Sequence, residues 1–165
     1  MKLRILTAVA VAGLMLAGCS TPKKQEAAAV AQAQTQTPPP AAPRGPAPDS
    51  IEYFNTVVGN LVHFEFDKYD VTAADQAILR GQATWLNQYP ARTVTIEGHC
   101  DERGTREYNL GLGDRRANAV KAYLVSLGVN ASRVKTISYG KERPTCVASA
   151  EDCWGKNRRG ISTVQ

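Results

Sequence analysis

The two side chains of this sequence whose types and spacing best suit chemistry are Asp101 and Arg116. Asp101 follows an alternating apolar stretch, residues 93–97, and Arg116 lies fifteen residues later, inside an expected helix. Gly98 and Gly104 bracket the loop between them. A short strand-loop-helix can bring both side chains to one end of a sheet. A carboxylate and a guanidinium facing a common gap would suit a ligand that carries both an ammonium group and a carboxylate.

Other interpretations of these residues remain open. Asp101 and Arg116 could form a structural salt bridge between loop and helix. The adjacent Arg115 is expected to be a solvated helix position, because neighbouring helical residues point about 100° apart. Glu97 with Asp101 could form the carboxylate pair of a glycan hydrolase. The chain has no nucleophile elbow, H-E-x-x-H pattern or phosphate loop, so catalysis has little support.

Alternating strands and helices must position these residues. Period-two stretches predict strands over 61–66, 93–97, 133–139 and 161–164. Thr72 and Asp75 resemble a capping box that opens a helix ended by Pro90, and a second helix is expected over 107–127. Asn109 is expected to cap that second helix at its start, and Gly128 to cap its end.

Such alternation predicts α/β units with crossovers, but the periodicity does not settle the strand order. If the strands over 61–66 and 93–97 are parallel neighbours, Phe66 and Asp67 end at the same edge as Asp101. Asn157, Arg158 and Arg159 form a basic cluster before the last strand, which could reach a ligand or form a solvated rim.

The N-terminal fifty residues predict export and a tether. Residues 1–18 combine Lys2 and Arg4 with an apolar run of about twelve, which is too short to span a bilayer and typical of a secretory signal. Leu-Ala-Gly-Cys at residues 16–19 resembles a lipobox, so Cys19 is expected to carry lipid. Residues 19–50 are rich in Ala, Gln and Pro and are expected to be a disordered tether with a coil size of roughly 30 Å.

Residues 51–165 remain as one domain, and their charges are nearly balanced. Although the whole chain has a net charge of +5, this part contains 15 basic and 13 acidic residues. A nucleic-acid-binding domain is expected to show a basic excess, so no nucleic-acid partner is predicted.

Three cysteines fall within this domain. Cys146 and Cys153 are close in sequence, and in an exported protein the natural expectation is a disulfide. Cys100 remains as a small, partly buried thiol. A metal site is not expected, because His99, Cys100 and Asp101 are consecutive and cannot all face one ion.

One ordered pattern, D-x-x-G-x-x-x-x-N-x-x-L-x-x-x-R-A, resembles the OmpA-like peptidoglycan-binding domain family. Its fixed positions are Asp101, Gly104, Asn109, Leu112, Arg116 and Ala117. The stretches GHCDERGT, SYGKERP and NRR are similar to the peptidoglycan-associated lipoprotein branch. The resemblance covers roughly residues 61–164, almost the whole expected domain.

The resemblance implies an α/β (α+β) fold: a β-α-β-α-β sandwich with an added strand, whose small mixed sheet carries two main helices on one face. It implies that Asp101 binds the side-chain ammonium of meso-diaminopimelate in peptidoglycan stem peptides and that Arg116 binds its side-chain carboxylate. Further ligand contacts are expected, less firmly, from Phe66, Asp67, Arg103, Asn109 and Leu112.

It also implies no cofactor and no catalysis. The expected protein is an outer-membrane lipoprotein on the periplasmic face that tethers the membrane to the wall. Ser20 after the lipidated cysteine favours the outer membrane under the family's sorting rule. Partners of the Tol type, chiefly a TolB-like propeller protein, and a role in cell division are implied. A pure protein-interaction module is a further alternative, against which the intact Asp101/Arg116 spacing argues.

Overall fold

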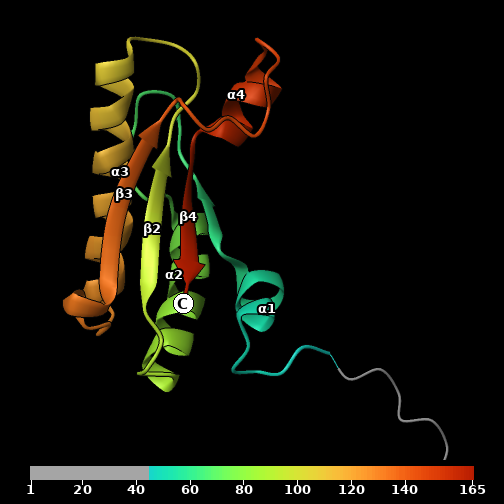
Figure 1. Ribbon diagram of the computed structural model, residues 1–165, viewed down its shortest axis with the longest axis vertical. Helices are drawn as coiled ribbons and strands as arrows, with labels where there is room; N and C mark the ends of the chain where they lie inside the picture. The colour runs from blue at the N-terminus through green and yellow to red at the C-terminus, as the bar shows by residue number, and fades with distance from the viewer. Residues whose placement is uncertain (1–44) are drawn as a thin grey trace, which may run out of the picture. The chain divides into compact units, whose positions relative to one another are not determined.

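One mixed sheet of four strands, in the order β1-β4-β2-β3, organises the chain (Figure 1). The computed structural model describes residues 45–165. β4 pairs antiparallel with both β1 and β2, and β2 pairs parallel with β3. β1, β2 and β3 therefore run in one direction. The strands are β1 Leu61–His63, β2 Val94–His99, β3 Val134–Gly140 and β4 Arg159–Val164.

Two long helices cover one face of this sheet, as the family resemblance implied (Figure 1). They are α2, Ala73–Gln88, and α3, Arg106–Ser126. Shorter elements precede and follow them: α1 Ile51–Tyr53, a π-helical stretch Phe54–Gly59, a 3-10 turn Ala131–Arg133 and α4 Glu151–Asn157. The expected α/β class and two-helix layer are confirmed.

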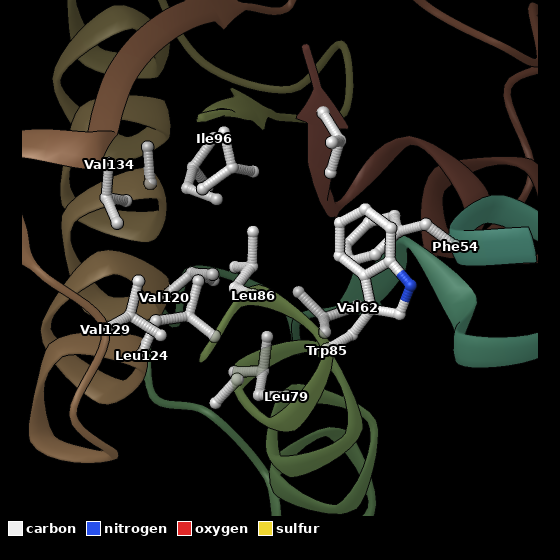
Figure 2. Packing of buried hydrophobic residues seen from close by; sticks show 14 of the residues in the cluster. Phe54, Val62, Leu79, Trp85, Leu86, Ile96, Val120, Leu124, Val129 and Val134 are labelled. Atoms are coloured by element: carbon white, nitrogen blue, oxygen red, sulfur yellow. The ribbon is translucent and has the colours of Figure 1, made fainter. Parts of the chain in front are cut away.

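Buried apolar side chains from the sheet and from α2 and α3 form a single core (Figure 2). Ile96 in β2 and Leu79, Leu86 and Leu124 in the helices have no exposed surface. Burying such a side chain contributes about 1.5–3 kcal/mol. This core fixes both helices on the sheet and so sets where their first turns lie.

Helix ends follow the sequence signals at two positions. The Thr72 hydroxyl oxygen accepts a hydrogen bond from the Asp75 N–H at 3.3 Å, which confirms the predicted cap of α2. Gly128 adopts the left-handed conformation, with φ +91°, after the end of α3. Glycine reaches this region without the penalty that a side chain would bring.

The predicted cap of α3 was wrong. Thr105, not Asn109, precedes the helix, and its hydroxyl accepts the Tyr108 N–H at 3.2 Å. Asn109 lies inside the first turn, where its amide donates to the carbonyls of Arg103 at 2.8 Å and Thr105 at 3.0 Å. Both residue types suit a cap, but the helix begins at Arg106, three residues before Asn109.

Strand limits and neighbours also differ from the prediction. β1 ends at His63, and Phe66 and Asp67 belong to the following loop, where Asp67 has a positive φ of 58°. β4 lies between β1 and β2, so these two are not neighbours. Because β1 and β2 still run in the same direction, the loops after them meet at one edge, as expected for parallel strands.

Helix α3 approaches β2 very closely through a pair of glycines. A Cβ atom added to Gly98 would overlap with the backbone of Gly113, so neither position has room for a larger residue. This contact brings the first turns of α3 against the end of β2. It thereby places Asn109 and Arg116 beside the loop that carries Asp101.

Candidate functional site

A pocket of about 160 Å³ lies at the sheet edge where β1 and β2 end and α3 begins. All seven residues expected to bind ligand contribute to its wall. Cys100, Gly104 and Tyr108 complete it. The lining consists of Phe66, Asp67, Cys100, Asp101, Arg103, Gly104, Tyr108, Asn109, Leu112 and Arg116.

Arg116 is fully buried at the inner end of this pocket. Its guanidinium donates to three backbone carbonyls: Nε to Lys68 at 2.8 Å, Nη1 to His99 at 2.8 Å and Nη2 to Glu65 at 3.0 Å. In the part of the chain that the structure describes, no carboxylate lies within salt-bridge distance of Arg116. Burial lowers the pKa of Arg116 from its ordinary value, because the charged form is poorly solvated.

Asp101 is also buried, but two other arginines pair with it. Arg103 Nη2 donates to Asp101 Oδ2 at 2.6 Å, and Arg158 Nη1 donates to the same oxygen at 3.3 Å. The Arg103 N–H donates to Oδ1 at 3.1 Å. Burial alone would raise the pKa of Asp101, but these hydrogen bonds outweigh it and hold the pKa below its usual value. The structural salt bridge between Asp101 and Arg116 does not form.

Arg103 lies between two aromatic rings at the mouth of the pocket. Its guanidinium carbon is 4.0 Å from the Phe66 ring centroid and 4.1 Å from that of Trp154. Trp154 is held in turn by its Nε1–H, which donates to Glu102 Oε1 at 2.9 Å. Each cation–π contact of this kind contributes about 0.5–2 kcal/mol. These contacts place the partly exposed Arg103 beside Asp101.

Further polar groups of the pocket lining come from α3, from the loop after β1 and from the residue after β2. The Tyr108 hydroxyl donates to Asp67 Oδ1, which raises the pKa of Tyr108. The Cys100 thiol is buried and donates to the Asn109 carbonyl at 3.3 Å, and burial raises its pKa. Cys100 is therefore a protonated wall residue, as expected of a small buried thiol.

Glu97 and His99 point to the sheet face opposite α2 and α3 and do not line the pocket. Glu97 Oε1 accepts the Thr163 hydroxyl at 3.0 Å, and Oε2 lies 3.6 Å from His99 Nε2. Burial and the charge of Arg159 lower the pKa of His99 to about 4. Glu97 and Asp101 therefore do not share a cleft, which removes the geometric basis for a hydrolase pair.

The disulfide between Cys146 and Cys153 is present and confirms the predicted pairing. It closes a loop that leads into α4 and then into Arg158 and Arg159. Both arginines are buried, so the solvated rim considered from the sequence is wrong. Arg159 donates to the carbonyls of Asn157 at 3.3 Å and Arg143 at 3.1 Å and does not contact Asp101.

Sequence reasoning missed Tyr108, Trp154 and the role of Arg158. Trp154 lies in the seven-residue helix α4, which has no strong periodic pattern, and Arg158 directly follows that helix. Arg158 lies four residues after Trp154, and nothing in the neighbouring sequence indicates that it contacts Asp101, 57 residues away.

Several predictions fall outside the described residues. They are the signal peptide over 1–18, the lipid on Cys19 and most of the tether over 19–50. The described part of the tether does contact the domain, because Trp85 Nε1 donates to the Pro48 carbonyl at 2.7 Å. Among residues 45–165, no helix has the length and apolar character needed to cross a bilayer.

Known proteins have sequences similar to this chain over the region of the fold. The OmpA family profile matches residues 63–158. The peptidoglycan-associated lipoprotein of Mesorhizobium japonicum is 44% identical over 160 residues, which cover 93% of this chain and 88% of that protein. The protein of the same name from Agrobacterium fabrum is 50% identical over 117 residues, which cover 71% of this chain and 66% of that protein.

A solved structure agrees with these sequence matches. The crystal structure of the peptidoglycan-associated lipoprotein from Burkholderia pseudomallei is 40% identical and superposes with a TM-score of 0.65, covering 67% of this chain and 96% of that one. This chain therefore belongs to the OmpA family and is a relative of the peptidoglycan-associated lipoproteins.

Proposed function

We propose that this protein binds peptidoglycan non-covalently through the pocket around Asp101 and Arg116, without catalysis. The observation that carries the proposal is a buried guanidinium that lines an open pocket and has no carboxylate partner among residues 45–165. A buried cation is costly unless an anion pairs with it. A ligand carboxylate that enters the pocket would supply this missing charge.

The ligand group that fits is the zwitterionic side-chain end of meso-diaminopimelate in a stem peptide. Three carbonyls fix the Arg116 guanidinium and use one N–H on each nitrogen. One further N–H on Nη1 and one on Nη2 remain for a carboxylate. Asp101 supplies the negative charge for the ligand ammonium. The family and the names of its relatives support wall association as the setting of this chemistry.

We further propose that lipid on Cys19 anchors the protein to the periplasmic face of the outer membrane, so that pocket and anchor together tether membrane to wall. Each charge-assisted contact contributes about 1.5–3 kcal/mol, which suggests weak to moderate affinity for one site. Many copies on one polymer sheet would add avidity. A TolB-like partner and a role of a Tol-Pal system in envelope integrity and cell division belong to the same proposal.

The test is sedimentation of the full-length chain, in detergent, with purified diaminopimelate-type peptidoglycan. Asp101→Ala should weaken binding by about 2–5 kcal/mol, because the ligand ammonium loses its counter-charge. Arg115→Ala is the matched control and should weaken binding much less, since Arg115 is exposed and does not line the pocket.

A Lys-type wall provides the second arm. Its stem peptide has the ammonium but lacks the distal carboxylate, so binding should drop strongly. Equal sedimentation with both walls, or wild-type sedimentation of a folded Asp101→Ala protein, would refute the proposed ligand chemistry. Mass spectrometry of the mature protein from its native membrane tests the anchor, and an unmodified Cys19 would overturn it.

A further inference from the structure

Arg158, at the C-terminal end of α4, reaches Asp101 from behind the pocket. Its guanidinium donates in three directions: Nε to the Phe64 carbonyl at 3.0 Å, Nη1 to Asp101 Oδ2 at 3.3 Å and Nη2 to Glu151 Oε1 at 2.6 Å. Its side chain is 9% exposed, and it does not line the pocket. Arg158 is therefore a fixed internal cation that ligand cannot touch directly.

Arg103 pairs with the same carboxylate oxygen from the other side. It lines the pocket, its side chain is 30% exposed, and it donates to Asp101 Oδ2 at 2.6 Å. A ligand ammonium that approaches Asp101 through the pocket meets Arg103 first. The two arginines thus differ in access. The ligand can replace Arg103 at the Asp101 carboxylate, whereas Arg158 keeps its contact.

We infer that Arg158 is a positioning residue for ligand binding, because it holds the Asp101 carboxylate in place and ionised while the ligand ammonium displaces or shares the contact with Arg103. The inference rests on the proposed function. A buried carboxylate needs a hydrogen-bonded counter-charge at every stage of binding. Arg103 cannot be that partner throughout, since it competes for the oxygen that the ligand requires.

The disulfide-closed loop keeps Arg158 in this position. Asn157, the residue before it, accepts the Cys146 N–H at 3.1 Å and donates to the Cys146 carbonyl at 2.7 Å. Cys146 is joined to Cys153 within α4. The disulfide-closed loop and α4 therefore hold Arg158 in place, and Arg158 in turn holds the Asp101 carboxylate from outside the pocket.

The experiment compares Arg158→Gln with Arg159→Gln in the full-length chain. Arg159 is the matched control because it is adjacent and similarly buried but donates only to backbone carbonyls. The first readout is the titration of the Asp101 side-chain carboxyl carbon by NMR. The second is the affinity for diaminopimelate-type peptidoglycan and the pH at which binding is lost on acidification.

Several neighbouring titratable and charged groups affect the pKa of Asp101. The groups that influence it are Cys100, Glu102 and Arg103 in its own loop, Arg116 from α3 and Arg158 from the end of α4. Arg158 is one of the hydrogen-bond donors that lower the pKa of Asp101, so Arg158→Gln should raise that pKa. The pH at which binding is lost should rise with it.

We expect Arg158→Gln to weaken wall binding roughly tenfold, the loss of one hydrogen bond to a charged group. Arg159→Gln should leave the pKa of Asp101 unchanged and binding within about twofold. Unchanged Asp101 titration and unchanged binding in folded Arg158→Gln would overturn the inference. Equal loss of binding in Arg159→Gln would also overturn it, because a general loss of structure would then explain both.

If Arg158→Gln does not fold, Arg158→Lys decides. Its ammonium keeps the charge but cannot reach three separated acceptors, so a smaller rise in the Asp101 pKa and weaker binding are expected. Wild-type behaviour of Arg158→Lys in both readouts would refute the inference. The NMR titration needs no ligand, so it separates a failure of the positioning role from a failure of the proposed wall binding.

Discussion

Replacing Arg116 by lysine should destabilise the fold itself, in addition to any effect on ligand. The guanidinium donates to the carbonyls of Lys68 and Glu65, in the loop after β1, and of His99, at the end of β2. It also lies with its central carbon 5.1 Å from the Phe64 ring centroid. A lysine ammonium at the same position is a single point and can recover at most about one of the three hydrogen bonds.

The expected loss is about 3–4 kcal/mol. Each hydrogen bond to a charged donor contributes about 1.5–3 kcal/mol, and two of them are lost. Glu65 and Lys68 are exposed loop residues, and their carbonyls can form hydrogen bonds with water instead. The loss of either of these two hydrogen bonds should therefore cost an amount near the lower end of that range. The bond to His99 is buried, and a carbonyl left there without a donor costs about 1–3 kcal/mol.

Urea unfolding of the full-length chain, followed by tryptophan fluorescence and circular dichroism, measures this difference. Arg115→Lys is the control at the adjacent exposed position and should stay within about 0.5 kcal/mol of the wild type. If Arg116→Lys also unfolds within 0.5 kcal/mol of the wild type, the three carbonyl contacts do not stabilise the protein and the reasoning fails. If Arg116→Lys does lose stability, the wall binding measured for Arg116 variants must be corrected for the fraction of protein that is unfolded.

Three more outcomes are expected. Gly98→Ala should cost about 3 kcal/mol or more in unfolding free energy, because its methyl group would overlap with the Gly113 backbone. Replacing Cys146 and Cys153 by serine should cost about 2.5 kcal/mol, measured by urea unfolding, and should weaken wall binding without abolishing it. The wild type should lose about 1–3 kcal/mol of stability as pH falls from about 7 to 4, and His99→Gln should lose less.

The sign of the His99 effect follows from the lowered pKa. With a pKa of about 4 in the folded protein and 6.5 in the unfolded chain, only the unfolded chain takes up the proton between these values. Acid therefore favours unfolding in this window. Identical pH profiles of the wild type and His99→Gln would contradict the assignment.

Gly111→Ala is the control for Gly98→Ala. It lies in the same helix as Gly113, and its added Cβ would meet only Arg115 Nη1, at 3.6 Å. An alanine there should be neutral or should stabilise the helix by about 0.5–1 kcal/mol. Equal destabilisation by both substitutions would show that the close approach of α3 to β2 is not the cause.

Sequence periodicity was sufficient to predict the four strands and two long helices. Their apolar residues recur with the period of a strand or of a helix, because one face of each element is buried. It was not sufficient for strand order, since β4 reaches the centre of the sheet through pairings over long sequence separations. The short helix α4 was missed because seven residues carry too little periodic signal.

For the site, side-chain types and the family pattern identified seven wall residues, all of which line one pocket. The partners of the two central charges could not be predicted in the same way. Arg116 contacts backbone carbonyls, which every residue has and no pattern marks. Arg158 reaches Asp101 only because a disulfide-closed loop folds back over the sheet edge.

The positions of the chain entry and the pocket have a mechanical consequence under the proposed function. Pro48 contacts Trp85 of α2, and Asp49 contacts Arg92, which lies two residues before β2, whereas the pocket lies beyond the end of that strand. A pull between membrane anchor and wall would therefore run along the strands. Hydrogen bonds between antiparallel strands lie across that direction, so β1–β4 and β4–β2 would share the load in shear instead of separating one bond at a time.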